Sequence, residues 1–284
     1  MELRHIADRD GRLSSFLREE LGMSTGLINK MKWQDKLFVN GIPQHADFAV
    51  KCGDVITVPL EEETPDYPAE DGDLTVIYED DHILAVDKPA GMLIHPSRSQ
   101  FTGTLANRVL GYFQRTCQQS AFHPVTRLDR DTFGIVLLAK NAHIHRLLQE
   151  DGAVQKTYHA LTYGGPQEEN GEINAPIQRL PLPSLLRQVH PDGKPSLTRF
   201  EVLEREGATC RLALQPITGR THQLRVHCAY MGYPIVGDPQ YNTEDSKAYS
   251  EKNGVYTQKL CAKSLEFTHP ITGEKRLLQS HMDV

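Results

Sequence analysis

The stretch RLDRDTFGIVLLA occupies residues 127–139 and joins a dense charge cluster to an apolar run. Two Asp and two Arg fall within residues 127–131, and the run Ile135–Ala139 is typical of a buried strand. Charges that lead straight into a core strand lie near low dielectric, where a carboxylate needs a cation beside it. A paired, oriented carboxylate suits nucleophilic or general-base chemistry; a solvated turn with incidental ion pairs is the alternative.

This stretch resembles the catalytic motif of pseudouridine synthases of the large-subunit ribosomal RNA (RluA) type, commonly His-Arg-Leu-Asp-x-x-Thr-Ser/Thr-Gly. The resemblance implies that its first Asp, here Asp129, is the nucleophile. Thr126 stands where the family usually has His, and Phe133 where it has a small hydroxyl residue. Neither touches the Arg-Leu-Asp core, so we expect them to affect the shape of the pocket and the choice of substrate more than the reaction.

Three other segments carry the same resemblance, in the family's order. Residues 78–91, YEDDHILAVDKPAG, look like the first motif, and residues 155–158, QKTY, match the Lys-x-Tyr element. Residues 218–227, TGRTHQLRVH, look like the third motif, and Gly237-Asp238-Pro239 follows at the expected distance. Together the four segments span most of residues 74–284.

Length and composition limit the possible number of domains, the location of the protein and the use of its cysteines. A chain of 284 residues with 39% hydrophobic content can form one large domain or two with a sizeable core. No apolar run approaches the ~18–20 residues of a membrane span, and the N-terminus lacks the apolar core of a signal peptide. The five cysteines are scattered and form no C-x-x-C, which favours reduced thiols in the cytoplasm over disulfides or a zinc site.

The net charge of −6 is concentrated in one short segment. Residues 61–73 hold seven acids and no base, residues 1–60 hold eight of each, and residues 74–284 therefore have 23 basic and 22 acidic residues. Local basic patches can still engage phosphates, because local charge contacts the nucleic-acid backbone. The overall acidity does not argue against an RNA partner.

The acidic, proline-containing segment 61–73 predicts an extended linker that packs poorly. Before it, residues 1–60 form a small unit. Leu13, Phe16, Leu17 and Leu21 recur at helical spacing, and Ser24 can cap a second helix. Residues 36–41 enter an Asn-Gly turn as a strand, and residues 54–58 form a closing strand.

This unit resembles the small RNA-binding domain named after ribosomal protein S-four, which the family often carries ahead of its catalytic part. Its phosphate contacts would come from five basic residues, Arg12, Arg18, Lys30, Lys32 and Lys36. The alternative is a plain helix pair with solvated lysines.

Residues 74–284 alternate strands with a few helices. Residues 74–79 and 82–87 predict a hairpin, residues 104–113 and 141–150 predict helices, and Leu224, Cys228 and Met231 mark a third helical face. Further strands are expected at residues 155–163, 198–203 and 209–215. This irregular mixture favours an α+β fold with a mixed, mainly antiparallel sheet of the pseudouridine synthase type, preceded by the small α+β domain.

Motifs for other chemistries are missing. The sequence contains no phosphate-binding loop, no dinucleotide-binding G-x-G-x-x-G and no G-x-S-x-G. His222 and His227 are five residues apart, and His143 and His145 two apart, which does not suit paired ligands on a helix. We therefore expect neither a metal nor a cofactor.

Site roles follow from the resemblance. It implies that Arg225 forms an ion pair with Asp129, and that Tyr158 stacks on the base and accepts a proton late in the reaction. On pattern alone, Tyr158 fits ordinary core packing and Arg225 a surface helix. We expect Arg127 and Lys88 to bind the RNA substrate and Lys88 to shape the pocket wall; the alternative for Lys88 is a solvated surface residue. A second carboxylate, Asp131, is the alternative nucleophile.

The leading hypothesis is a cytoplasmic, monomeric RNA-modifying isomerase that flips a uridine out of ribosomal or transfer RNA. One alternative is a non-catalytic RNA-binding or ribosome-assembly protein on the same fold. Another is a carboxylate-based nucleoside or glycoside hydrolase, which needs a second acidic carboxyl at a defined separation.

Overall fold

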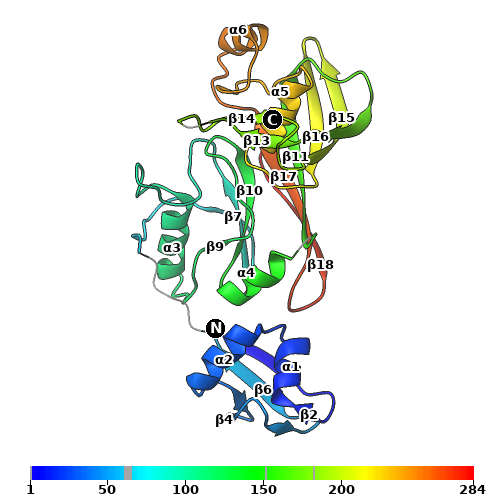
Figure 1. Ribbon diagram of the computed structural model, residues 1–284. Helices are drawn as coiled ribbons and strands as arrows, with labels where there is room; N and C mark the ends of the chain where they lie inside the picture. The colour runs from blue at the N-terminus through cyan, green and yellow to red at the C-terminus, as the bar shows by residue number, and fades with distance from the viewer. Residues whose placement is uncertain (1, 61–65, 151, 182) are drawn as a thin grey trace.

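The structure is a computed structural model that describes residues 2–60, 66–150, 152–181 and 183–284. It has a small N-terminal unit and a larger body built around one sheet (Figure 1). Both contain helices and mainly antiparallel strands, so the expected α+β class is confirmed.

The N-terminal unit forms one apolar core from two helices and short strands. Helix α1 spans Leu13–Glu19 and α2 spans Thr25–Trp33, and the Ser24 hydroxyl caps α2 by accepting from Leu27 N–H at 3.2 Å. The predicted helices are confirmed. The unit's strands are β1 (Glu2–Ile6), β2 (Gly11–Arg12), β3 (Phe38–Val39), β4 (Ile42–Pro43), β5 (Ala49–Val50) and β6 (Val55–Pro59).

Pairing in this unit runs β1-β6-β3-β4, with β2 and β5 as a separate pair. Asn40 and Gly41 both have positive φ, 52° and 78°, which the tight β3–β4 hairpin requires. The Asn-Gly turn is therefore confirmed. Strand β1, which the sequence did not predict, pairs antiparallel with β6.

The larger body is a ten-stranded sheet whose main order is β12-β15-β16-β11-β17-β10-β8-β7. All neighbours are antiparallel except β10 and β17, which makes the sheet mixed. Its strands are β7 (Thr75–Glu79), β8 (Ile83–Lys88), β9 (His123–Pro124), β10 (Phe133–Ala139), β11 (Val154–Tyr163), β12 (Asn170–Asn174), β15 (Leu197–Glu206), β16 (Thr209–Pro216), β17 (Leu260–Thr268) and β18 (Lys275–Gln279). Strands β13 (Ile177–Arg179) and β14 (Arg187–Val189) form a separate hairpin.

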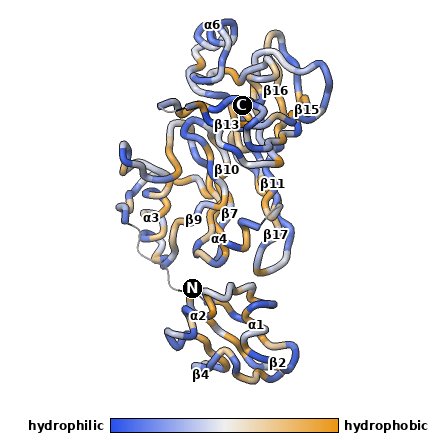
Figure 2. The backbone as a smooth tube through the Cα atoms, viewed as in Figure 1, coloured by the Kyte–Doolittle hydropathy of each residue, from blue (hydrophilic) through white to orange (hydrophobic). Residues whose placement is uncertain are grey.

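Helices cover both faces of the central strands. On one face, α3 (Leu105–Arg115) packs Val109 and Phe113 against Val136 and Leu138. On the other, α4 (Ala142–Leu148) and α5 (Gln223–Tyr230) share a core with the alternate residues of β10. Figure 2 shows apolar residues gathered where α3 meets β7 and β10. Burial on both faces explains why β10 reads as an unbroken apolar run.

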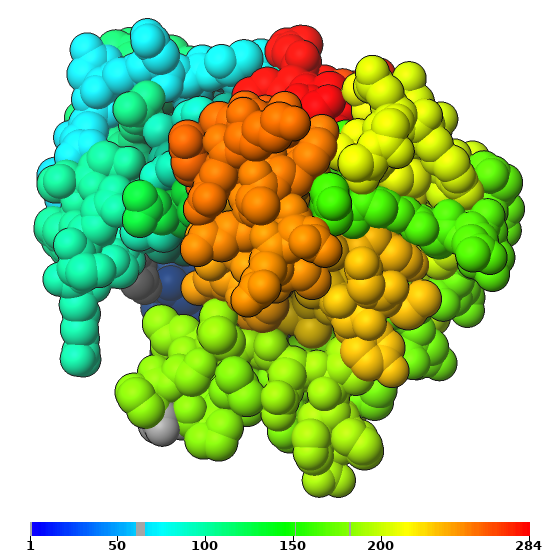
Figure 3. All heavy atoms as spheres, turned by 90° about the horizontal axis from the view of Figure 1, so that it is seen from above, coloured from blue at the N-terminus to red at the C-terminus, as the bar shows by residue number. Residues whose placement is uncertain are grey.

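The expected hairpin, helices and strands of this body are present, with ends shifted by a few residues. Helix α6 (Glu244–Lys252) was not predicted, because its face offers little apolar periodicity. Seen from above, α6 lies in the middle of the upper face, in orange (Figure 3).

The second half of the acidic segment differs from expectation. Tyr67 and Ala69 pack against the core that α3 closes, and Asn107 of α3 donates to the Pro68 carbonyl at 2.8 Å. The Glu70 carboxylate accepts from Gly103 N–H at 2.7 Å. The expectation that this segment packs poorly is wrong here, because Tyr67 and Ala69 are partly buried against the apolar cluster that includes α3. Residues 61–65 lie outside the described part of the chain.

The N-terminal unit contacts the larger body at α4. Arg146 donates to the Gly22 carbonyl, and the Leu147 side chain lies against Gly22. Figure 1 shows the same neighbourhood, with α4 facing the N-terminal unit.

Candidate active site

The loop that carries Asp129 is fixed at both ends. At its start, the buried Thr126 hydroxyl accepts from Leu137 N–H of β10 at 2.9 Å. At its end, the buried Thr132 hydroxyl accepts from the Gln258 amide at 2.7 Å. Thr126, the departure from the family's usual His, is therefore a structural anchor of the loop.

Gly134 lets this loop enter the sheet. Its φ is 107°, and a Cβ there would lie 2.4 Å from the carbonyl oxygen of Ala262 in β17. Only glycine fits this approach without strain. The close contact holds Asp129 near the point where β10 and β17 run parallel.

Lys88 stabilises the same loop from inside the core. Its ammonium is fully buried and donates to the carbonyls of Pro89, Met92 and Arg130 at 2.9, 2.8 and 2.9 Å. Burial lowers the pKa of Lys88 to about 8, against the opposing charges of Asp131 and Asp129. The expectation of an RNA contact or pocket-wall residue is wrong for Lys88, because no part of its side chain reaches the surface.

Arg225 of α5 joins two carboxylates. Its Nη1 donates to Asp129 Oδ2 at 3.1 Å, which is the expected ion pair. Its Nε and Nη2 donate to Asp238 at 2.7 and 2.8 Å, and Nη2 also donates to Gln240 at 2.9 Å. Such a planar, bidentate pairing fixes the direction of the guanidinium.

Exposure separates the roles of the two carboxylates. The Asp238 side chain is fully buried and that of Arg225 is 5% exposed, whereas Asp129 keeps 30% of its side chain exposed. Asp238 therefore holds Arg225 from inside the core, whereas Asp129 is accessible to a molecule that enters from solvent. Burial disfavours the charged guanidinium, but the hydrogen bonds and charge of Asp238, with those of Asp129, raise the pKa of Arg225.

Helix α5 is held rigidly by polar contacts of its buried side. The Gln223 amide donates to the Leu197 carbonyl and the Thr198 hydroxyl, both at 3.0 Å. His227 bridges the Thr198 hydroxyl at 2.9 Å and the Ala175 carbonyl at 3.0 Å. His227 of the third motif thus acts in the packing of α5. No cluster of three or more His, Cys, Asp or Glu suited to a metal occurs in the described residues.

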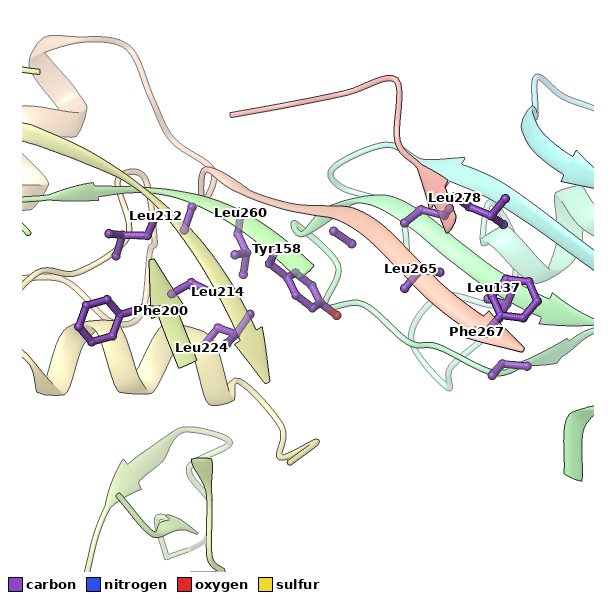
Figure 4. Packing of buried hydrophobic residues seen from close by; sticks show 14 of the residues in the cluster. Leu137, Tyr158, Phe200, Leu212, Leu214, Leu224, Leu260, Leu265, Phe267 and Leu278 are labelled. Carbon is purple, nitrogen blue, oxygen red and sulfur yellow. The ribbon is translucent and has the colours of Figure 1, made fainter. Parts of the chain in front are cut away.

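Tyr158 of β11 contributes to both the core and the cleft. The ring lies beside Leu214 and Leu260, and its hydroxyl points away from them (Figure 4). The side chain is 9% exposed and lines the same cleft as Asp129. Burial, followed by the nearby Asp129 charge, raises the pKa of Tyr158, so the phenol stays protonated at neutral pH.

His222 is a site residue that the sequence analysis treated only as a poor metal ligand. It precedes α5 with φ of 58°, a left-handed conformation, and its Nε2 lies 3.8 Å from Asp129 Oδ2. Its Nδ1 lies 2.8 Å from the Tyr241 hydroxyl, which accepts from Arg187 N–H at 2.9 Å. Burial lowers the pKa of His222, so the ring is neutral at pH 7.

Asp238, Gln240 and Tyr241 also belong to the site, although the sequence assigned them no role. The Tyr241 ring lies 4.9 Å below the Arg225 guanidinium. The available signal was the Gly237-Asp238-Pro239 motif, in which the acidic residue is now explained as the buried partner of Arg225.

These residues line a cleft of about 890 Å³. Asp129 is its only acidic residue among the described lining residues; the basic ones are Arg127, Lys156, Arg199, Arg220 and Arg225. Burial and the charge of Arg127 lower the pKa of Lys156. Such a cationic cleft attracts a polyanion and leaves Asp129 as its single carboxylate. Asp131, the alternative nucleophile, does not line it.

The basic residues expected to bind RNA lie in two places. Arg127 is exposed at the cleft, whereas Arg12, Arg18, Lys30 and Lys32 are exposed on the N-terminal unit. Lys36 there is partly buried. None of the N-terminal five lines the catalytic cleft. In the described part of the chain, every helix falls short of what a membrane span requires.

Comparison with known proteins agrees with this geometry. Residues 82–230, more than half of the chain, match the RNA pseudouridylate synthase family. YjbO of Bacillus subtilis, named an uncharacterized RNA pseudouridine synthase, is 36% identical over 261 residues, which cover 90% of each chain. Ribosomal large subunit pseudouridine synthase C of Vibrio cholerae is 34% identical over 293 residues, covering 96% of this chain and 91% of that one.

A solved structure shares the fold. Human RNA pseudouridylate synthase domain containing 1 superposes with a TM-score of 0.60 at 26% identity, covering 76% of this chain and 92% of that one. The expected sheet architecture of the catalytic part is thereby confirmed. From the matched family, the relatives and the shared fold, we conclude that this chain belongs to the RNA pseudouridine synthase family and is an isomerase.

Proposed function

We propose that this protein converts specific uridines of large-subunit ribosomal RNA to pseudouridine, with Asp129 as the reacting carboxylate. The observation that carries the proposal is the chain of contacts Asp129–Arg225–Asp238 at the floor of a cationic cleft. The ribosomal substrate is supported by relatives that are named ribosomal large subunit pseudouridine synthases. We place the protein, as a monomer, in the cytoplasm with that substrate.

The reaction conserves all atoms except for exchange of one proton with water. The bond from ribose C1′ to N1 of the base breaks, the base turns, and a bond from C1′ to C5 forms. The proton on C5 leaves to solvent, and N1 takes one up. Asp129 can attack C1′, attack the base, or deprotonate the sugar, and each route needs an ionised carboxylate in a defined position.

Arg225 holds the Asp129 carboxylate in that position. Its 3.1 Å hydrogen bond to Asp129 favours the charged carboxylate and aims it, while Asp238 prevents the guanidinium from turning away. The His222 Nε2 lies 3.8 Å from the same Asp129 oxygen and adds a second neighbour that restricts the position of the carboxylate.

Tyr158 supplies a flat wall for the base. The protonated phenol is a poor base in the resting enzyme, so its first role is to stack on the detached uracil. Proton acceptance late in the reaction requires an electron-rich intermediate next to it.

A uridine inside folded RNA must leave its stack before Asp129 can reach it. The cleft is large enough for one nucleotide and its neighbours, and the exposed Arg127 stands at the side of Asp129. We assign Arg127 the role of filling the space that the flipped base leaves and of contacting the RNA backbone.

The test is tritium release from an unmodified large-subunit ribosomal RNA transcript labelled at uridine C5. The proposal expects release of tritium without release of free uracil. Free uracil would identify a hydrolase, and neither product would identify a non-catalytic RNA-binding protein. Mapping of pseudouridines in cells with and without the gene would identify the RNA, and sites confined to transfer RNA would overturn the ribosomal assignment.

A further inference from the structure

Trp33 is the only tryptophan of the chain and, among the large hydrophobic residues that the structure describes, the most exposed, at 86%. It is the last residue of α2, whose inner face is already filled by Ile28 and Met31. The indole therefore contributes almost nothing to the core of its own domain. An exposed ring of this size usually marks a surface that another molecule covers.

Trp33 continues a defined face of α2. Gly26, Asn29, Lys30 and Trp33 follow the spacing i, i+3, i+4 and i+7, and all four are exposed. Lys32 is exposed beside them, and α2 has no acidic residue. This face combines one flat aromatic ring with two cations, although the chain as a whole has a net charge of −6.

The face starts close to the catalytic cleft. Gly22, three residues before α2, contacts Arg146 and Leu147 of α4. Gln149 and Gly152, which follow α4, line the cleft of Asp129. Helix α4 therefore lies between the cleft and the start of α2, and Trp33 is at the other end of α2.

We propose that Trp33, with Lys30 and Lys32, is a stacking platform for an unpaired base of the RNA substrate, outside the catalytic cleft. The inference rests on the proposed function, because it takes the partner to be the same RNA. Aromatic rings flanked by cations suit single-stranded RNA, since the ring stacks on a base while the cations meet the phosphates. The positive charge of α2 favours this partner over an apolar protein surface.

The single tryptophan makes the stacking directly measurable. Emission from the wild-type protein should be quenched as an unmodified large-subunit ribosomal RNA transcript, or a uridine dodecamer, is added. Salt should reduce the effect of the dodecamer, because the two lysines act through phosphates. Unchanged emission under conditions where labelled RNA is bound would overturn the proposal, and would point to a protein partner for this face.

Substitutions separate stacking from apolar contact. Trp33→Ala should raise the Kd for the labelled transcript about 5- to 150-fold, the effect of removing one stacked aromatic ring. Trp33→Phe should keep most of the affinity, and Trp33→Leu should lose it, because leucine lacks a π face. Ile42→Ala, which removes a 60% exposed apolar side chain of the same domain, is the matched control and should change nothing.

Measurements of turnover separate a failure of the stacking platform from a failure of the proposed catalytic function. At saturating RNA, Trp33→Ala should release tritium at the wild-type rate and show only a raised KM. An active enzyme whose KM and Kd are unaffected by Trp33→Ala refutes the platform and leaves the function intact. An inactive wild-type protein refutes the function first.

Discussion

Arg225 and Asp129 lie 96 positions apart in the chain and are joined by a 3.1 Å hydrogen bond. The same guanidinium grips the fully buried Asp238 with its other two nitrogens. The buried Asp238 thus holds Arg225 in place, and Arg225 in turn fixes the position of the Asp129 carboxylate, which is exposed to the cleft.

Asp129→Asn should abolish pseudouridine formation and leave folding and RNA binding nearly intact. The amide keeps the shape of the side chain and removes its charge, and the site is 30% exposed, so burial of the amide costs little. Tritium release, RNA affinity and Tm should be measured together. Retention of more than a few per cent of turnover would return the assignment to Asp131.

Arg225→Lys should lose most turnover but fold, and Arg225→Met should lose turnover and stability. Lysine keeps the charge without the planar fork, whereas methionine leaves Asp238 buried without its cation, at a cost of about 3–5 kcal/mol. Urea unfolding and kcat would be compared for the two variants. RNA affinity should be largely unchanged in both; a collapse of affinity with normal kcat at saturation would make Arg225 an RNA contact.

Asp238→Asn should lower kcat about 10- to 100-fold and leave KM unchanged. Asp238 never reaches the cleft, and its loss weakens charge-assisted hydrogen bonds that aim Arg225. Asp245→Asn, on the exposed first turn of α6, is the matched control and should change neither kcat nor KM. A change in KM alone would contradict a positioning role.

His143 should make stability depend on pH between about 4 and 6.5. Burial in α4 lowers the pKa of His143 to about 4, so the unfolded chain takes up the proton first as the pH falls. The contribution is fully present above pH 6.5 and is lost toward pH 4, with about 1–2 kcal/mol lost by pH 5. Urea unfolding at pH 7 and 5 should show a smaller pH dependence in His143→Gln than in wild type.

The exposed His45 provides the comparison for that experiment. His45→Gln should keep the wild-type pH dependence. Equal pH dependence in all three proteins would show that folding does not lower the pKa of His143.

Deletion of residues 1–65 should leave a folded, active core, and deletion of residues 1–72 should leave a less stable one. The longer deletion removes Tyr67 and Ala69 from the α3 core and the Glu70 hydrogen bond to Gly103. Both should bind long RNA more weakly, with the log–log salt slope flatter by about 0.7–0.9 for each phosphate that the shortened protein no longer binds. Tm and affinity against salt would be measured for each protein.

Equal salt slopes for the full chain and the shorter deletion would show that residues 1–60 do not touch phosphates. An insoluble 66–284 fragment would show that the packing of Gly22 with Arg146 and Leu147 belongs to a shared core.

The family resemblance and the α+β class could be recognised in the sequence alone, and the resemblance then pointed to Asp129, Tyr158 and Arg225 as candidate site residues. The helices and strands follow from local order, such as an apolar period or a capping residue like Ser24, whereas the candidate site residues follow from motifs that resemble those of the family. Local order is retained whatever the rest of the chain does, so these features could be predicted without coordinates. The small N-terminal unit was predictable for the same reason, down to its Asn-Gly turn.

Which polar groups are buried, and which partners they have, became clear only from the packing of distant segments. Lys88, expected at the RNA surface, became an internal support because three carbonyls from two loops converge on it. Asp238 became the partner of Arg225, and Tyr67 a core residue, through contacts between distant segments. Burial and pairing are properties of packed elements, and a charge or ring has no fixed environment until those elements meet.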